Sequence, residues 1–280
     1  MGEVLEYTAR REPYEVGRFV YLPDTRPYVF YLKLKYESLK VVGVLERIVS
    51  SFTRLKIPIL QLKMSVPHGV GCMLRMIIIA DLSNCEEEAS RLVSELGKIP
   101  MVVDVEYDKP LFDGVAVDAR SFPLTLMGER VVITRKVIYK DLFKKGWEKI
   151  GSSYGALLYL IGFEIGRDAF RNHYRITGDR KMAFELNKKL FQLVGYGILE
   201  DVEINDHRRR AIVRIHGSFE CELFKGSGGN RGSLLKGIVA GWFAEYWGGV
   251  DFNEIIAIET NCIARGDPYC EYLIEVKKST

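Results

Sequence analysis

The amino-acid sequence predicts an α+β protein with two domains. The chain has 280 residues, enough for two separate cores. Its first third alternates short apolar runs with two amphipathic helical segments, and the remainder places long helices among pairs of strands. The hydrophobic fraction of 48% and the aromatic fraction of 11% are those of a globular chain. We therefore expect an N-terminal β-α-β-β-α-β domain and a C-terminal α/β domain in which long helices pack on an antiparallel sheet.

The N-terminal elements are expected to follow a polar, irregular segment of residues 1–25. Alternating apolar side chains predict a strand over Val29–Lys35. Helical spacing then predicts a helix over Leu39–Leu55 with Ser38 as its N-cap. The remaining predicted elements are a strand over Ile59–Val66, a turn over 67–71, a strand over Met73–Leu82, a helix from Ser83 to Leu96 and a strand over Met101–Tyr107.

This order, taken as a domain of residues 26–110, is the split-βαβ or ferredoxin-like arrangement. In topology and pattern it resembles the ACT type of regulatory domain. ACT domains that bind amino acids usually carry an acidic residue and Pro-Gly after the first strand, whereas this chain has Glu37-Ser38-Leu39 there. A role in dimerisation or structure is therefore at least as well supported as an amino-acid site.

Residues 109–122 are expected to connect this domain to a second domain of residues 122–278. Three glycines in one predicted helix, Gly155, Gly162 and Gly166, indicate that another backbone or a ligand approaches closely. The predicted elements are a hairpin over Leu126–Arg135, helices over Ile138–Ile150, Tyr154–Tyr174, Arg180–Val194 and Ser233–Trp247, and strands over Gly197–Asn205, Arg209–His216, Ile255–Cys262 and Cys270–Val276.

Charge and hydropathy argue against several classes of partner. The 40 basic and 37 acidic residues give a net charge of +3, too weak a field to attract nucleic acid or an anionic membrane. The longest apolar runs are far too short to span a bilayer. The N-terminus has no apolar signal-peptide core, so we expect a cytoplasmic protein. In that compartment Cys72 and Cys85 are expected to act as small core hydrophobes.

The closing hairpin carries the most specific pattern. Cys262 and Cys270 face each other across it, and Glu259 lies three residues before the first cysteine. In a reducing compartment such a pair binds metal more often than it forms a disulfide. Thiolates with one carboxylate suit a structural zinc ion, which needs four ligands, and Cys221 is the candidate for the fourth. A water could take that place, and two reduced structural thiols are the alternative reading.

These residues also resemble the end of a 4-vinyl-reductase domain, over roughly residues 122–277. The run Glu259-Thr-Asn-Cys262, the turn Gly266-Asp-Pro268 and the run Cys270-Glu-Tyr272 match the closing hairpin of that family. The glycine-punctuated helix around Gly237-Ile-Val-Ala-Gly241 matches the helix that precedes it. Members of the family include the sensor half of phenol-responsive transcription activators and a protein associated with bacteriochlorophyll vinyl reduction, and the fold is related to subunits of vesicle-tethering complexes.

The resemblance implies a sensor domain with a pocket for a small hydrophobic or aromatic ligand, between the long helices and the sheet. It also implies zinc bound by the hairpin residues and by a cysteine at the start of the preceding helix, where this chain has Gly232 and Ser233. Cys221 would then have to reach in from a neighbouring segment. The aromatic candidates for the pocket, which could equally be core residues, are Tyr159, Phe163, Trp242, Phe243, Tyr246 and Trp247.

Together these features favour a cytoplasmic small-molecule-sensing regulatory protein that signals through a homodimer or a partner protein. Two alternatives stay open: an auxiliary enzyme subunit in tetrapyrrole or aromatic metabolism, and an interaction module with a filled hydrophobic cavity. The sequence carries no Ser-His-Asp, His-Glu-x-x-His or paired-carboxylate pattern and no hydride-carrying cofactor motif. That absence favours a binding protein over an enzyme.

Overall fold

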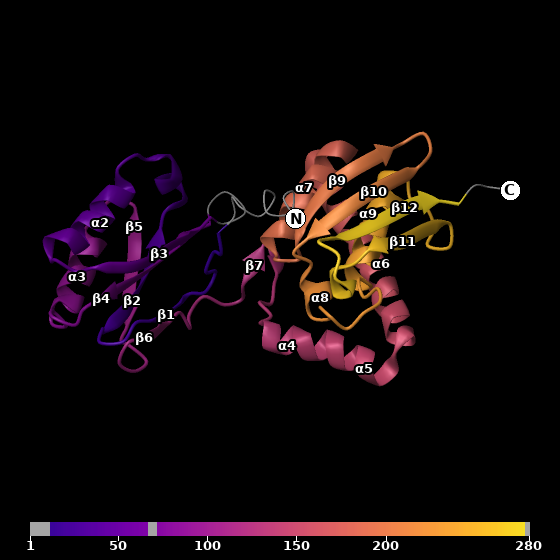
Figure 1. Ribbon diagram of the computed structural model, residues 1–280. Helices are drawn as coiled ribbons and strands as arrows, with labels where there is room; N and C mark the ends of the chain where they lie inside the picture. The colour runs from indigo at the N-terminus through magenta and orange to yellow at the C-terminus, as the bar shows by residue number, and fades with distance from the viewer. Residues whose placement is uncertain (1–11, 67–71, 278–280) are drawn as a thin grey trace. The chain divides into compact units, whose positions relative to one another are not determined.

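The computed structural model describes residues 12–66 and 72–277, and the chain divides into two compact units. We call Pro13–Ile133 the N-terminal unit and the part from Thr134 onward the C-terminal unit (Figure 1). The expected turn over 67–71 lies outside the described residues. Helices and antiparallel strands occur in both units, which confirms the α+β class.

The N-terminal unit is built on an antiparallel sheet whose strand order, over the described residues, is β3-β4-β2-β5. Helices α2 and α3 lie on the same face of this sheet (Figure 1). Buried side chains such as Phe30, Ile48 and Leu92 form the core between them. The elements are β2 (Pro27–Leu34), α2 (Val44–Arg54), β3 (Ile59–Ser65), β4 (Leu74–Asp81), α3 (Glu88–Gly97) and β5 (Val102–Asp108).

Both helices of this unit begin later than the sequence predicted. Tyr36–Lys40 forms a 3-10 helix, η1, and Val41 then takes an extended conformation with φ −101° and ψ 114°. The β-branched pair Val41-Val42 thus interrupts the predicted helix, and Ser38 does not cap it. At the second helix, the Ser83 hydroxyl donates to the Asp81 carboxylate at 2.5 Å, and α3 starts at Glu88.

Two short strands lie in segments that were expected to be irregular or connecting. These strands, β1 (Phe19–Tyr21) and β6 (Val115–Val117), pair antiparallel with each other. Ala116 and Val20 pack against the sheet face opposite to the helices, beside Val29 and Ile79. A three-residue strand shows too little alternation to be recognised from sequence. The predicted hairpin over Leu126–Arg135 is reduced to β7 (Thr125–Leu126) and β8 (Glu129–Arg130).

The C-terminal unit contains a second antiparallel sheet, with the order β11-β12-β10-β9 over the described residues. Its strands are β9 (Ile198–Asn205), β10 (Arg210–His216), β11 (Ile255–Asn261) and β12 (Cys270–Val276). Its helical segments are α4 (Lys136–Lys140), the π-helical turn η2 (Asp141–Lys145), α5 (Gly146–Ile150), α6 (Ser152–Thr177), α7 (Arg180–Leu193), α8 (Phe219–Glu222), α9 (Leu234–Tyr246) and the 3-10 turn η3 (Ile263–Arg265). The last strand in sequence, β12, is therefore an interior strand of the sheet.

Helices α6 and α9 pack along each other at backbone distance. A β-carbon on Gly162 would lie 2.2 Å from the carbonyl oxygen of Leu234, and one on Gly237 would lie 2.3 Å from that of Tyr159. The glycines thus provide the close helix contact that the sequence indicated. All residues of α9 are buried except Lys236 and Glu245.

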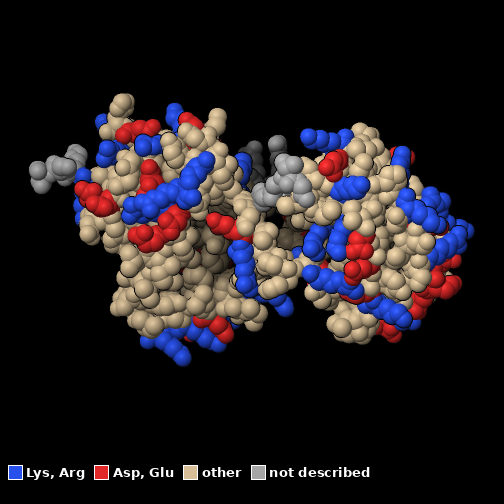
Figure 2. Space-filling model, turned by 180° about the vertical axis from the view of Figure 1, so that it is seen from behind, with Lys and Arg blue, Asp and Glu red and all other residues tan. Residues whose placement is uncertain are grey.

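The surface of the N-terminal unit carries interspersed charges of both signs (Figure 2, right). On the face shown, an area below the middle of the C-terminal unit has few charged side chains, above the charges at its lower edge (Figure 2, left). Throughout the described part of the chain, no helix combines the length and the apolar content needed to cross a bilayer.

Candidate functional site

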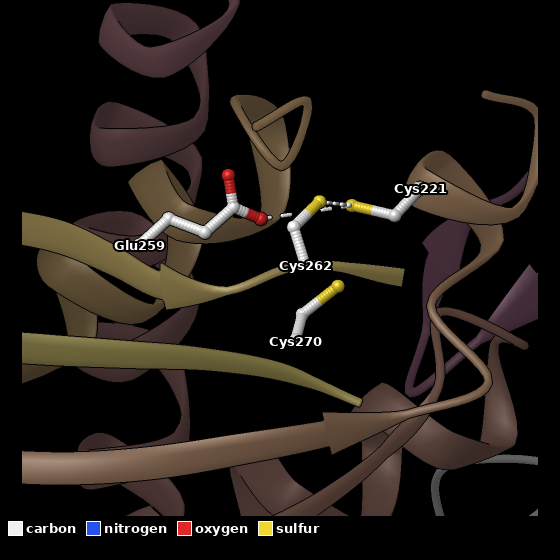
Figure 3. Close-up of side chains that lie close together, drawn as sticks. All are labelled: Cys221, Glu259, Cys262 and Cys270. Atoms are coloured by element: carbon white, nitrogen blue, oxygen red, sulfur yellow. Dashed lines mark hydrogen bonds between the residues drawn. The ribbon is translucent and has the colours of Figure 1, made fainter. Parts of the chain in front are cut away.

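Four buried side chains meet where β11 turns toward β12 (Figure 3). Cys221 comes from α8, Glu259 from β11, Cys262 from the residue after β11, and Cys270 from the first position of β12. Their ligand atoms all lie within 4.8 Å of one another. The Cys221 sulfur is 3.7 Å from the Cys262 sulfur and 3.8 Å from Glu259 Oε1. Zn–S bonds of about 2.3 Å in a tetrahedron place sulfurs about 3.8 Å apart, so this spacing fits zinc.

Local hydrogen bonds hold three of these side chains in place. The Ser218 hydroxyl caps α8 by accepting the backbone N–H of Cys221 at 3.3 Å. The Asp267 carboxylate accepts the backbone N–H of Cys262 at 2.8 Å. The backbone N–H of Ile263 donates to the Cys270 sulfur at 3.5 Å. The turn between β11 and β12 thus presents both of its cysteines inward.

Position 232, where the sequence resemblance implied a cysteine, is closely surrounded by side-chain atoms. A β-carbon on Gly232 would lie 2.3 Å from the Tyr272 hydroxyl and 2.6 Å from Glu259 Oε1. The Gly232 N–H instead donates to Glu259 Oε2 at 3.3 Å. The fourth member of the cluster is Cys221, the substitute that the sequence suggested. Cys72, in contrast, is exposed because it precedes the start of β4, so its predicted burial was wrong.

The four buried acidic groups of the cluster cannot all carry a negative charge without a cation to offset it. Burial, followed by the charge of Cys262, raises the pKa of Glu259 to about 8. Hydrogen bonding with Cys262 and Cys270 raises the pKa of Cys221 well above its usual value, while hydrogen bonding with Cys221 lowers that of Cys262. A bound cation would replace the retained protons and offset the charge of all four groups.

Glu220, which the sequence analysis did not select, directly precedes Cys221 in the chain and binds the start of α9. Its carboxylate is fully buried and accepts backbone N–H groups at the start of α9, from Ser233 at 3.0 Å, Leu234 at 2.9 Å and Leu235 at 3.0 Å. Burial raises its pKa to about 7, against the lowering effect of these three donors. An acidic residue next to a candidate ligand cysteine was the available signal.

Of the six aromatic residues predicted to bind a ligand, five lie in the core of the C-terminal unit. They contact other rings: Phe243 is 4.9 Å from Trp247 between centroids, and Phe163 is 5.0 Å from Phe252. The indole N–H of Trp242 is buried and has no hydrogen-bond acceptor among the described residues. The sixth residue, Tyr159, is only partly buried and lines a groove.

This groove lies between α5, α6, α9 and β11 and has a volume of about 510 Å³. Trp147 and Tyr159 provide aromatic walls, and Lys236 and Lys277 provide positive charge. Glu259 belongs both to the groove lining and to the cluster of cysteines. The groove and the candidate metal centre are therefore adjacent.

Comparisons with known proteins give distant likenesses. No protein-family model matches the chain. The uncharacterized protein MJ0150 of Methanocaldococcus jannaschii is 24% identical over 127 residues, which are 45% of this chain and 68% of that protein. The phenol-responsive sensory domain of the transcription activator PoxR, solved with phenol, has 16% identity and a TM-score of 0.45, and the match covers 53% of this chain and 77% of that one.

Two further solved structures are similar to about half of the chain. A vinyl-4-reductase family protein from Methanocaldococcus jannaschii has 18% identity and a TM-score of 0.33, and the match covers 54% of this chain and 85% of that one. A trafficking protein particle complex subunit 3 from Naegleria fowleri, covalently bound to palmitic acid, has 11% identity and a TM-score of 0.37, and the match covers 51% of this chain and 93% of that one. Because these TM-scores are low, the proposals below rest on the residues of this chain.

Proposed function

We propose that the C-terminal unit is a small-molecule-sensing domain of the 4-vinyl-reductase type with a structural zinc ion bound by Cys221, Glu259, Cys262 and Cys270. The observation that carries the proposal is the burial of these four ligand groups within 4.8 Å of one another. Four protein ligands leave no open position, which is the pattern of a structural rather than a catalytic zinc. The ion, when bound, supplies a cross-link between α8 and the β11-β12 hairpin.

A buried hydroxyl beside the cluster supports an ionised ligand set. Tyr272 is fully buried, and its hydroxyl has no hydrogen-bond acceptor among the described residues. The space that a β-carbon on Gly232 would occupy lies within 2.3 Å of this hydroxyl and 2.6 Å of Glu259 Oε1. A buried donor without an acceptor costs about 1–3 kcal/mol, and the Glu259 carboxylate, held ionised by zinc, would be the acceptor for a hydrogen bond from this hydroxyl.

In this proposal the sensed molecule is hydrophobic or aromatic and enters the aromatic centre of the C-terminal unit, by which we mean the core side chains Phe163, Trp242, Phe243, Tyr246 and Trp247. The buried, unpartnered indole N–H of Trp242 supports a ligand that carries a hydrogen-bond acceptor. The N-terminal unit is an ACT-like, ferredoxin-like regulatory domain in the same proposal. The protein acts in the cytoplasm, and a homodimer or a partner protein receives the signal.

The zinc proposal is tested by metal analysis of the purified full-length chain. We expect about one zinc per chain in the wild type, far less in Cys221→Ser, and the wild-type amount in Cys72→Ser, whose side chain is exposed. A wild type without metal that also fails to bind added zinc would refute the metal centre. Equal zinc in Cys221→Ser and wild type would remove Cys221 from the ligand set.

The sensing proposal has a separate test. Native mass spectrometry of the full chain should reveal a co-purifying organic molecule, or saturable uptake of added phenol. The variant Trp242→Phe removes the indole N–H and should weaken binding of phenol about tenfold, whereas zinc content should stay unchanged. Failure of every aromatic probe to bind the zinc-loaded protein would contradict the sensing role and leave the metal centre standing.

A second candidate function is an interaction module, favoured by exposed apolar side chains on the helices that precede α7. Helix α6 alone exposes Leu157, Leu160, Ile161 and Ile165, each by more than two fifths of its surface. Monomeric proteins rarely expose contiguous apolar patches of this kind without a partner. The part of the C-terminal unit with few charges is visible in Figure 2. A stable complex that forms without any small molecule would favour this candidate over the sensor.

A further inference from the structure

We propose that the groove between α5, α6, α9 and β11 is a second binding site, specific for an aromatic carboxylate. This site is distinct from the aromatic centre. Of the six aromatic residues predicted to bind a ligand, Tyr159 alone is among the described residues that line the groove. Its volume of about 510 Å³ is within the range of small-molecule sites. The inference therefore goes beyond the sensing function and does not depend on it.

Lys236 provides the strongest evidence for an anionic ligand. Helix α9 has two residues that are not buried, Lys236 and Glu245. Glu245 is neutralised by Arg167 at 2.8 Å and Arg171 at 2.7 Å. Lys236 forms no salt bridge with any carboxylate of the described residues, although it is held in an otherwise apolar helix and lines the groove. The charge of Lys236 acts on Glu259 and Glu220, but it forms no salt bridge with either carboxylate, so a ligand carboxylate would supply its first direct ion pair among the described residues.

The acidic residue of the groove feels the charge of this lysine but forms no salt bridge with it. Among the described residues that line the groove, Glu259 is the one carboxylate. Its Oε1 lies 3.8 Å from the Cys221 sulfur, and its Oε2 accepts the Gly232 N–H at 3.3 Å. Lys277 adds a second positive charge to the lining. The groove thus keeps a net positive charge near Lys236.

The form of the anion follows from the donors that are present. A phosphate usually binds several backbone N–H groups at the start of a helix. At the start of α9, those of Ser233, Leu234 and Leu235 already donate to the Glu220 carboxylate. The groove therefore offers ammonium groups rather than a backbone cradle, which suits a carboxylate with its single charge better than a phosphate.

The aromatic part of the ligand follows from the walls. The Lys236 ammonium lies 5.6 Å from the centroid of the Tyr159 ring, so an anion at the lysine places its attached ring beside Tyr159. Trp147 forms another wall, and its buried indole N–H has no acceptor among the described residues. Aromatic rings beside a cation and an unpaired donor together fit a flat ring that carries a carboxylate.

The test measures binding of 1-naphthoate to the zinc-loaded full chain by isothermal titration calorimetry. We expect saturable binding to the wild type and at least tenfold weaker binding to Lys236→Gln, since one charge-assisted contact is lost. Lys236→Arg should recover most of the affinity. The matched control is Lys225→Gln, an exposed lysine outside the groove lining, and it should bind as the wild type does.

The neutral isostere 1-naphthalenemethanol separates charge from ring recognition, and it should bind at least tenfold more weakly than 1-naphthoate. Equal affinity of wild type and Lys236→Gln for 1-naphthoate would overturn the proposal, as would the absence of saturable binding at millimolar concentrations. Loss of 1-naphthoate binding in Trp242→Phe together with wild-type binding in Lys236→Gln would also overturn it, because the ligand would then occupy the aromatic centre. Zinc content and circular dichroism of each variant establish that it is folded.

Discussion

A β-carbon built on Gly166 would lie 2.1 Å from the carbonyl oxygen of Ile238, so α6 and α9 meet backbone to backbone at this point. The contact is reciprocal, because a β-carbon on Gly241 would lie 2.1 Å from the carbonyl oxygen of Phe163. Helices with larger residues at these positions would have to separate, which would open the core of the C-terminal unit.

The substitution Gly166→Ala should therefore destabilise the C-terminal unit by about 3 kcal/mol or more, since the added methyl group meets backbone rather than a flexible side chain. The free energy of unfolding from urea titration measures this. The control is Gly97→Ala at the end of α3, where a β-carbon meets no atom within 4 Å and where alanine should be neutral or stabilising. Equal effects of the two substitutions would contradict the close helix contact.

Glu220 should be important for stability although it is not a member of the cluster. Glu220→Gln replaces one of the two oxygens that accept from the α9 N-terminus with an amide nitrogen that cannot accept, and we expect a loss of about 2–4 kcal/mol. The control is Glu222, an exposed residue two positions later. Glu222→Gln should change the free energy of unfolding by less than about 0.5 kcal/mol. Similar thermal midpoints for both variants would argue against the capping role.

Zinc affinity should rise with pH. In the metal-free unit, burial and the charge of Cys262 raise the pKa of Glu259 to about 8, and hydrogen bonds raise that of Cys221. These groups keep their protons at neutral pH, and zinc must displace them. Because the metal-free state binds more protons, raising the pH favours the zinc-bound state, by about tenfold per pH unit for each proton released. Competition with a chelating dye between about pH 6 and 8 measures this slope, and a pH-independent affinity would contradict it.

The apolar stripe on α6 gives a prediction for self-association. Leu157, Ile161 and Ile165 recur every fourth residue, so two antiparallel copies of α6 centred on Ile161 would bring Leu157 against Ile165. Ile161→Glu should shift a dimer to monomers in sedimentation velocity. Val202→Glu is the matched control, since Val202 and Ile161 are both 43% exposed. A monomeric wild type, or dissociation by both variants, would rule out this face as the dimer interface.

Elements with clear periodicity were predicted to within a few residues, as for α7 and β12. The starts of α2 and α3 were missed because a 3-10 helix before α2 and the hydrogen bond of Ser83 to Asp81 delay them. The glycines of α6 predicted a close approach, but the identity of the approaching helix depends on tertiary packing.

The candidate metal residues were predictable because thiols are few and their chemistry is specific. Glu220 was missed: its place beside Cys221 was the available signal, but its partners are backbone N–H groups, which the side-chain pattern does not reveal. Lys236 carried a signal that went unused, a lone charge between Leu235 and Gly237 in an apolar helix. The six aromatic residues carried no such signal, because aromatic side chains occur both in cores and in ligand pockets, and the sequence does not distinguish the two.

Strand β12 lies between β10 and β11, although it follows both in the chain. During synthesis on the ribosome, β9 and β10 can form their hairpin early, but β11 has no partner in the sheet until β12 has emerged. Cys270 is the first residue of that strand and also the last of the four clustered ligand groups to be made. Closure of the sheet and completion of the candidate metal-binding set therefore require the same segment of the chain, so a nascent chain stalled before β12 would expose both an unpaired strand and an incomplete set of thiols.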